Sequence, residues 1–86
     1  MELRGYEKNA INIYPNPAED VLYIELPFLQ EDVRFQMSDV RGRVVDDWIY
    51  SGVSRVEIPV GDIPEGVYFL RISGPGINDV KKIFVE

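Results

Sequence analysis

The feature that most constrains the fold is the alternation of apolar and polar residues in short runs that end at Pro, Gly, Asn or Asp. β-Branched and aromatic residues recur at every second position, which is the period of a half-buried strand. No long stretch keeps an apolar face at helical spacing. The sequence therefore predicts an all-β chain with essentially no α-helix.

Seven runs of this kind are expected to be strands. They lie at about residues 11–14, 21–26, 33–38, 43–50, 55–58, 67–72 and 80–85. Short strands with turn signals every 8 to 12 residues or so, in a chain of 86 residues, are typical of a sandwich. We expect residues 10–86 to form a single immunoglobulin-like β-sandwich of about seven antiparallel strands in two sheets.

Two turn motifs have a clear physical reading. Pro15, Asn16 and Pro17 predict a rigid turn, because each Pro fixes its own φ and pushes the preceding residue to extended geometry. We interpret this turn as structural rather than as a partner contact. Gly42 is expected at positive φ in the hairpin between the third and fourth predicted strands.

The segment before the sixth predicted strand resembles a tyrosine corner. Its sequence is I-P-E-G-V-Y at residues 63–68. In such a corner the chain crosses between sheets and a Tyr hydroxyl bonds to upstream backbone. Tyr68 is therefore first of all a structural residue, and Gly66 supplies the turn.

Composition excludes most catalytic chemistry. The chain has no Cys and no His, so it lacks the thiolate nucleophile, the commonest general base and the commonest metal ligand. The adjacent acidic pairs at 19–20, 31–32 and 46–47 do not have the spacing of a calcium loop. We expect neither an enzyme nor a bound metal or cofactor.

Charge and hydropathy restrict the partners. Fifteen acidic residues against nine basic ones give a net charge of -6, without a basic patch for nucleic acid. No apolar stretch approaches the roughly 18 to 20 residues of a membrane span. Residues 1–9 lack the apolar segment of a signal peptide, and we expect them to be a linker remnant or the start of a fragment, partly disordered.

Three aromatic residues support an alternative function. Trp48, Tyr50 and Tyr23 could form a stacking platform for sugars, although aromatic residues of a β domain more often pack across strands. The alternative to the function described next is therefore a carbohydrate-binding or adhesive β-sandwich module of a secreted enzyme.

Five segments together resemble a known family. They are Y-P-N-P-A-E-D at 14–20, L-Y-I-E-L at 22–26, S-D-V-R-G-R-V-V at 38–45, I-P-E-G-V-Y-F-L-R-I at 63–72 and K-K-I-F-V-E at 81–86. In this order and spacing they look like the C-terminal sorting domain of type IX secretion cargo proteins. The resemblance covers about residues 10–86.

The resemblance implies a function that composition alone does not show. Such domains end larger exported proteins of the Bacteroidota phylum, which reach the periplasm through a signal peptide elsewhere in the precursor. The translocon and shuttle proteins of type IX secretion would then recognise the folded domain. A surface sortase-like protease would remove it, leaving the cargo on the outer membrane surface or in the extracellular medium.

The last predicted strand is the candidate recognition element. Lys81 and Lys82 are expected on opposite faces, where charges on an edge strand also prevent aggregation. An edge with unpaired backbone groups could accept a strand from the translocon, with Ile83 and Val85 filling pockets. The candidate recognition residues are Gly66, Tyr68, Lys81, Lys82, Ile83 and Val85.

Overall fold

A computed structural model describes residues 11–86, which form five strands and no helix. The strands are β1 (Asn12–Tyr14), β2 (Val21–Ser38), β3 (Val44–Pro59), β4 (Gly66–Gly74) and β5 (Ile77–Val85). The expectation that residues 1–9 are a linker remnant lies outside the described residues. The chain is all-β, as the alternation predicts.

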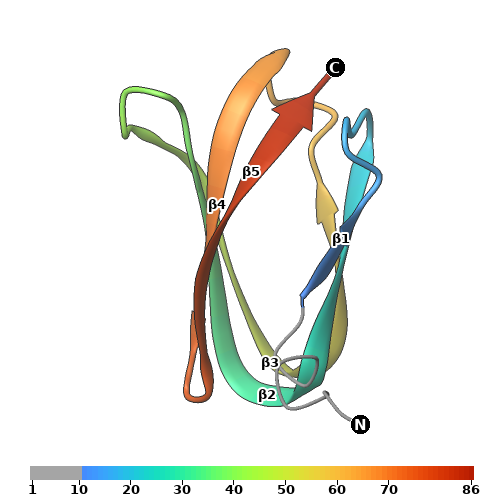
Figure 1. Ribbon diagram of the computed structural model, residues 1–86, viewed down its shortest axis with the longest axis vertical. Coiled ribbons are helices and arrows are strands. Elements are labelled where there is room, and N and C mark those ends of the chain that lie inside the picture. Colours follow the sequence, from blue (N-terminus) through green and yellow to red (C-terminus); the bar gives the residue numbers. More distant parts are fainter. Residues whose placement is uncertain (1–10) are drawn as a thin grey trace, which may run out of the picture.

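The five strands form one antiparallel sheet around β2. β1 and β3 pair with β2, β4 pairs with the second half of β2, and β5 pairs with β4. Figure 1 shows β2 and β3 curling together, so that the two halves of the sheet face each other. One half holds β1 with the start of β2 and the end of β3, and the other holds β4 and β5.

The curl has a cause in the register of β2 and β3. Glu25 pairs with Arg55, and pairing resumes at Gln30 with Val53. Four residues of β2 thus lie opposite one residue of β3, and such extra residues bend a strand pair. Gly52, at φ 66°, lies next to this bend in β3.

The expected seven-stranded sandwich of two sheets is not confirmed. The strands predicted at 21–26 and 33–38 are both parts of β2. Those predicted at 43–50 and 55–58 both fall in β3, which begins one residue later than predicted. Pairing of β2 with β3 resumes beyond the bend, so one sheet replaces two. Turn signals such as Pro27 and Gly52 mark the bend and not the end of a strand.

The curled sheet encloses a single apolar core. Alternate residues of β2, β3, β4 and β5 point into it, as the period of two predicts. The side chains that are less than 2% exposed include Leu22, Ile24, Val33, Phe35, Met37, Ile58, Leu70, Ile72 and Ile83. Burial of these side chains stabilises the fold at roughly 25 cal/mol per Å² of apolar surface.

Candidate recognition site on the last hairpin

The predicted recognition residues come together on the hairpin of β4 and β5. Gly66 pairs with Val85 and Tyr68 pairs with Ile83, at the end of the hairpin remote from its turn. Lys81 pairs with Leu70 farther along. The register thus gathers residues that are well separated in the sequence.

Tyr68 makes the bond expected of a tyrosine corner. Its hydroxyl donates to the carbonyl oxygen of Pro64 at 2.5 Å, and its side chain is buried. Gly66 has φ 159°, a conformation that side-chain-bearing residues rarely adopt, and it lies against the Tyr68 ring. These contacts fix the path of the chain from β3 into β4.

Ile83 and Val85 lie in the core of the chain itself. They are 1% and 2% exposed. The interpretation that they fill pockets of a partner is therefore corrected: they share the inner face of the hairpin with Tyr68, where period-two alternation directs every second residue. The alternation of residues 81–85 does not by itself tell which face is buried.

Lys81 and Lys82 point to opposite faces, as expected. The ammonium of Lys81 lies 3.5 Å from the carboxylate of Asp79, in an exposed ion pair. Lys82 is exposed on the outer face, where its Nζ lies 5.5 Å from the centre of the Phe84 ring. Lys82 and Phe84 are thus the residues that this end of β5 presents outward.

The Pro-Asn-Pro turn lies along the outer edge of β5. The carboxamide of Asn16 accepts a hydrogen bond from the backbone N–H of Phe84 at 2.9 Å and donates to the carbonyl of Lys82 at 3.3 Å. The backbone of Ala18 accepts from Glu86 N–H and donates to Phe84 O, both at 2.8 Å. The edge expected to be unpaired is therefore occupied from residue 82 to residue 86.

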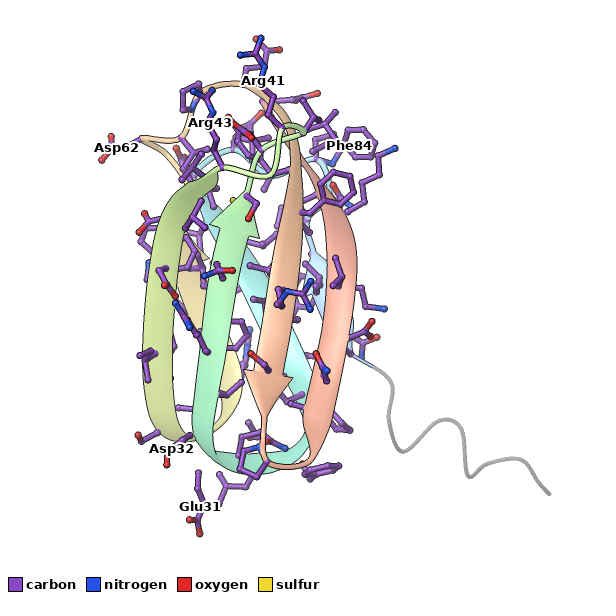
Figure 2. The ribbon with its side chains drawn as sticks, turned by 90° about the vertical axis from the view of Figure 1, so that its left-hand side faces the viewer. Glu31, Asp32, Arg41, Arg43, Asp62 and Phe84 are labelled. Carbon is purple, nitrogen blue, oxygen red and sulfur yellow. The ribbon has the colours of Figure 1, made fainter. Side chains whose placement is uncertain are left out.

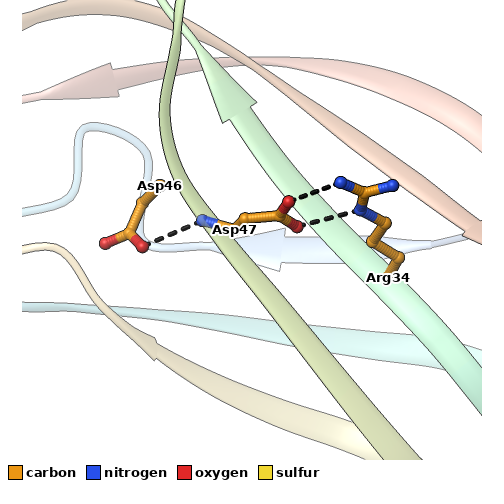
Figure 3. A network of polar contacts seen from close by, with 3 residues as sticks. All are labelled: Arg34, Asp46 and Asp47. Carbon is orange, nitrogen blue, oxygen red and sulfur yellow. Dashed lines mark hydrogen bonds and ion pairs between the residues drawn. The ribbon is translucent and has the colours of Figure 1, made fainter.

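Aspartate side chains bind backbone N–H groups elsewhere along the outer strands. Asp79 Oδ1 accepts from Val80 N–H in β5, and Asp46 Oδ1 accepts from Asp47 N–H in β3, each at 2.8 Å. Figure 3 shows the second contact. Such local bonds and charges disfavour pairing with another strand.

Asp47 also forms an ion pair with Arg34. The guanidinium donates through Nη2 at 2.6 Å and Nε at 3.0 Å to the two carboxylate oxygens (Figure 3). These side-chain bonds lower the pKa of Asp47 and raise the pKa of Arg34. The pair joins β2 to β3 on the outer face of the sheet.

The hairpin at 39–43, which connects β2 to β3, is held by one carboxylate. Asp39 Oδ1 accepts from the backbone N–H groups of Arg41 and Arg43, and Oδ2 accepts from Arg43 Nε at 2.9 Å. The backbone bond from Arg43, with its side-chain bond, lowers the pKa of Asp39. Gly42 has φ 85°, as predicted for this turn.

The proposed sugar platform is split between two faces. Trp48 and Tyr50 pack against the core, with the Tyr50 ring edge-on to Phe35 at 5.9 Å. Tyr23 instead stacks on Tyr14 at 5.6 Å, on the outer face of the other half of the sheet. These three aromatic residues do not form one stacking surface.

The acidic pairs do not gather into a metal site. No group of three His, Cys, Asp or Glu side chains suited to a metal ion occurs within residues 11–86. In the same part of the chain, no helix has the length and apolarity to cross a membrane.

The model of the secretion system C-terminal sorting domain family matches residues 12–86, which include the turn at 15–17 and the whole β4–β5 hairpin. The chain belongs to this family. Sorting domains are signals for type IX secretion and not catalysts. Membership implies a cargo fused upstream, the type IX machinery as partner, and export across the outer membrane to the surface or beyond. No curated protein matches the chain.

Proposed function

We propose that this sorting domain is recognised as a folded surface, while its cargo is in the periplasm of a bacterium of the Bacteroidota phylum. The translocon and shuttle proteins of type IX secretion would bind the outward side of the β4–β5 hairpin. The observation that carries the proposal is the family match over residues 12–86, which spans every described strand. The domain performs no reaction.

The candidate residues divide into two roles. Gly66, Tyr68, Ile83 and Val85 act indirectly, because they are turned inward or hold the path of the chain. The candidates for direct contact are Lys82, which is exposed on the outer face, and Lys81, which lies in an exposed ion pair with Asp79. The turn at residues 15–17 supports the shape of β5 through Asn16.

The last steps of secretion separate the cargo from the domain. A surface sortase-like protease would cut the domain off after passage, and the cargo would then be attached to an anionic lipopolysaccharide or released. Mass spectrometry of the mature cargo tests this step. We expect no peptides containing Tyr68 on the exported protein, and their retention would contradict removal of the domain.

Export of a reporter fused upstream of the chain tests recognition. Deletion of residues 81–86 is expected to abolish export, and unchanged export would refute a role for this strand. Because the deletion also removes Ile83 and Val85 from the core, it must be compared with Lys82→Glu, which alters an exposed side chain. We expect Lys82→Glu to lower export while the purified chain unfolds at nearly the same temperature.

A further inference from the structure

The outer face of the β4–β5 hairpin exposes large apolar side chains. Phe69, Val80 and Phe84 are 38%, 44% and 42% exposed. The register places Phe69 opposite Lys82 and Arg71 opposite Val80. These positions alternate with the buried ones, so the exposed residues share one continuous surface.

This surface continues into a hollow beside the hairpin at 39–43. The hollow has a volume of about 420 Å³, and its apolar lining is Val40, Val44, Phe69 and Val80. Val40 and Val44 are 69% and 52% exposed. Exposed apolar surface gathered in one concave place is typical of an interaction site. We call this hollow the hairpin groove.

The rim of the hairpin groove is ordered by Asp39. Its carboxylate binds two backbone N–H groups and the Arg43 guanidinium within the hairpin. Figure 2 shows Arg41, Arg43 and Phe84 at the same end of the molecule. A groove with a preformed rim loses little conformational entropy when a partner binds.

The charges of the groove differ from those of the whole chain. Arg71 lines the groove, and Lys82 is the next exposed residue of β5 after Val80. The outer face of β4 and β5 carries these two cations and no carboxylate, although acidic residues outnumber basic ones by 15 to 9 in the chain. Asp39, the acidic residue of the lining, already accepts bonds from Arg43. The groove therefore favours an acidic partner.

We propose that the hairpin groove binds a protein segment of the type IX machinery that carries apolar side chains flanked by carboxylates. This inference rests on the proposed function and names the surface and the chemistry of the partner. A protein is favoured over an anionic membrane, because lipid-binding sequences usually cluster about four to eight basic residues. The lining of the groove holds one basic residue, Arg71, and is concave and apolar.

Charge substitutions in the groove test the proposal. In the reporter fusion, Val80→Glu and Arg71→Glu are expected to lower export about tenfold or more, because each places a carboxylate against the acidic partner. The matched controls are Ile49→Glu, also an exposed apolar position of a strand, and Arg55→Glu in the opposite half of the sheet. Both controls are expected to be exported like the unchanged chain.

Substitutions of opposite charge at Val80 distinguish a loss of recognition from a folding defect. Val80→Lys and Val80→Glu place similar side chains at one exposed position, and thermal unfolding of each purified chain measures the folding effect directly. We expect Val80→Lys to be exported at least several-fold better than Val80→Glu. Equal export of the two variants would overturn the proposal that the partner is acidic.

The remaining outcomes are distinguishable. If the unchanged fusion is not exported, the proposed function fails, and this inference fails with it. If the unchanged fusion and all groove variants are exported equally, only the groove assignment is overturned. The purified chain is also tested for binding to phosphatidylglycerol vesicles. If it binds them and Arg71→Glu abolishes this binding, the proposal of a protein partner is overturned in favour of a lipid surface.

Discussion

The backbone N–H of Phe84 donates to Oδ1 of Asn16 at 2.9 Å, across 68 positions of the sequence. The same carboxamide donates to the carbonyl of Lys82. One side chain thus satisfies a donor and an acceptor of β5, as a neighbouring strand would. Strand addition at residues 82–86 would first require displacement of this turn.

Removal of the Asn16 carboxamide should loosen the edge of β5. We expect Asn16→Ala to lower the free energy of unfolding by about 1 to 2 kcal/mol, because two hydrogen bonds are lost. Urea unfolding measures this change, and amide exchange at Phe84 should become faster. Asn78→Ala, at an exposed position of the same strand, is the control and should change stability by less than about 0.5 kcal/mol. Unchanged exchange at Phe84 would contradict the assignment.

Two Tyr→Phe substitutions separate a structural hydroxyl from an exposed one. Tyr68→Phe leaves the Pro64 carbonyl without its partner and should cost about 1 to 2 kcal/mol of stability. Tyr14→Phe removes an exposed bond to Glu25 and should cost less than about 0.5 kcal/mol. Denaturant unfolding of both variants makes the comparison, and equal effects would argue against a tyrosine corner.

Glycine substitutions test the entry into β4. Gly66→Ala should cost about 1 to 3 kcal/mol, because φ 159° strains any residue with a Cβ. Gly61→Ala places its Cβ at an ordinary 3.5 Å from Asp20 and should be neutral or stabilising by up to about 1 kcal/mol. If thermal unfolding shows the two variants to be equally stable, the conformation of Gly66 does not limit the fold.

Acid should weaken the hairpin at 39–43. The folded-state pKa of Asp39 lies below its usual value, so the stabilisation is present above about pH 4 and is lost as the pH falls through the folded-state pKa. Asp39→Asn should therefore destabilise the chain at neutral pH and differ less from the unchanged chain in acid. Urea unfolding at about pH 7 and pH 3 gives the comparison. An equal difference at both pH values would contradict this role of the carboxylate.

The sequence predicts local structure well and long-range pairing poorly. The alternation at Val33, Phe35 and Met37 predicts their burial, and Gly42 marks a hairpin. A bend within a strand and the end of a strand have similar turn signals in the sequence, so Pro27 does not reveal that β2 continues beyond it. Only the pairing of β2 with β3 distinguishes a bend from a strand end, and that pairing joins residues that are far apart in the sequence.

The candidate site shows the same limit. The alternation at residues 81–85 puts Lys82 and Phe84 on one face and Ile83 and Val85 on the other, but the choice of the buried face depends on packing against the other half of the sheet. The contact of Asn16 with β5 has no local signal, because its partners lie more than 60 positions away. The family resemblance supplied the function, which neither pattern nor composition could.

Export of a reporter by paired strains tests the central claim most directly. The reporter is fused upstream of the chain and expressed in a host with type IX secretion and in the same host lacking the translocon. We predict reporter on the surface or in the medium of the first strain, and retention inside the outer membrane of the second. Equal amounts outside both strains, or retention in both, would contradict the account.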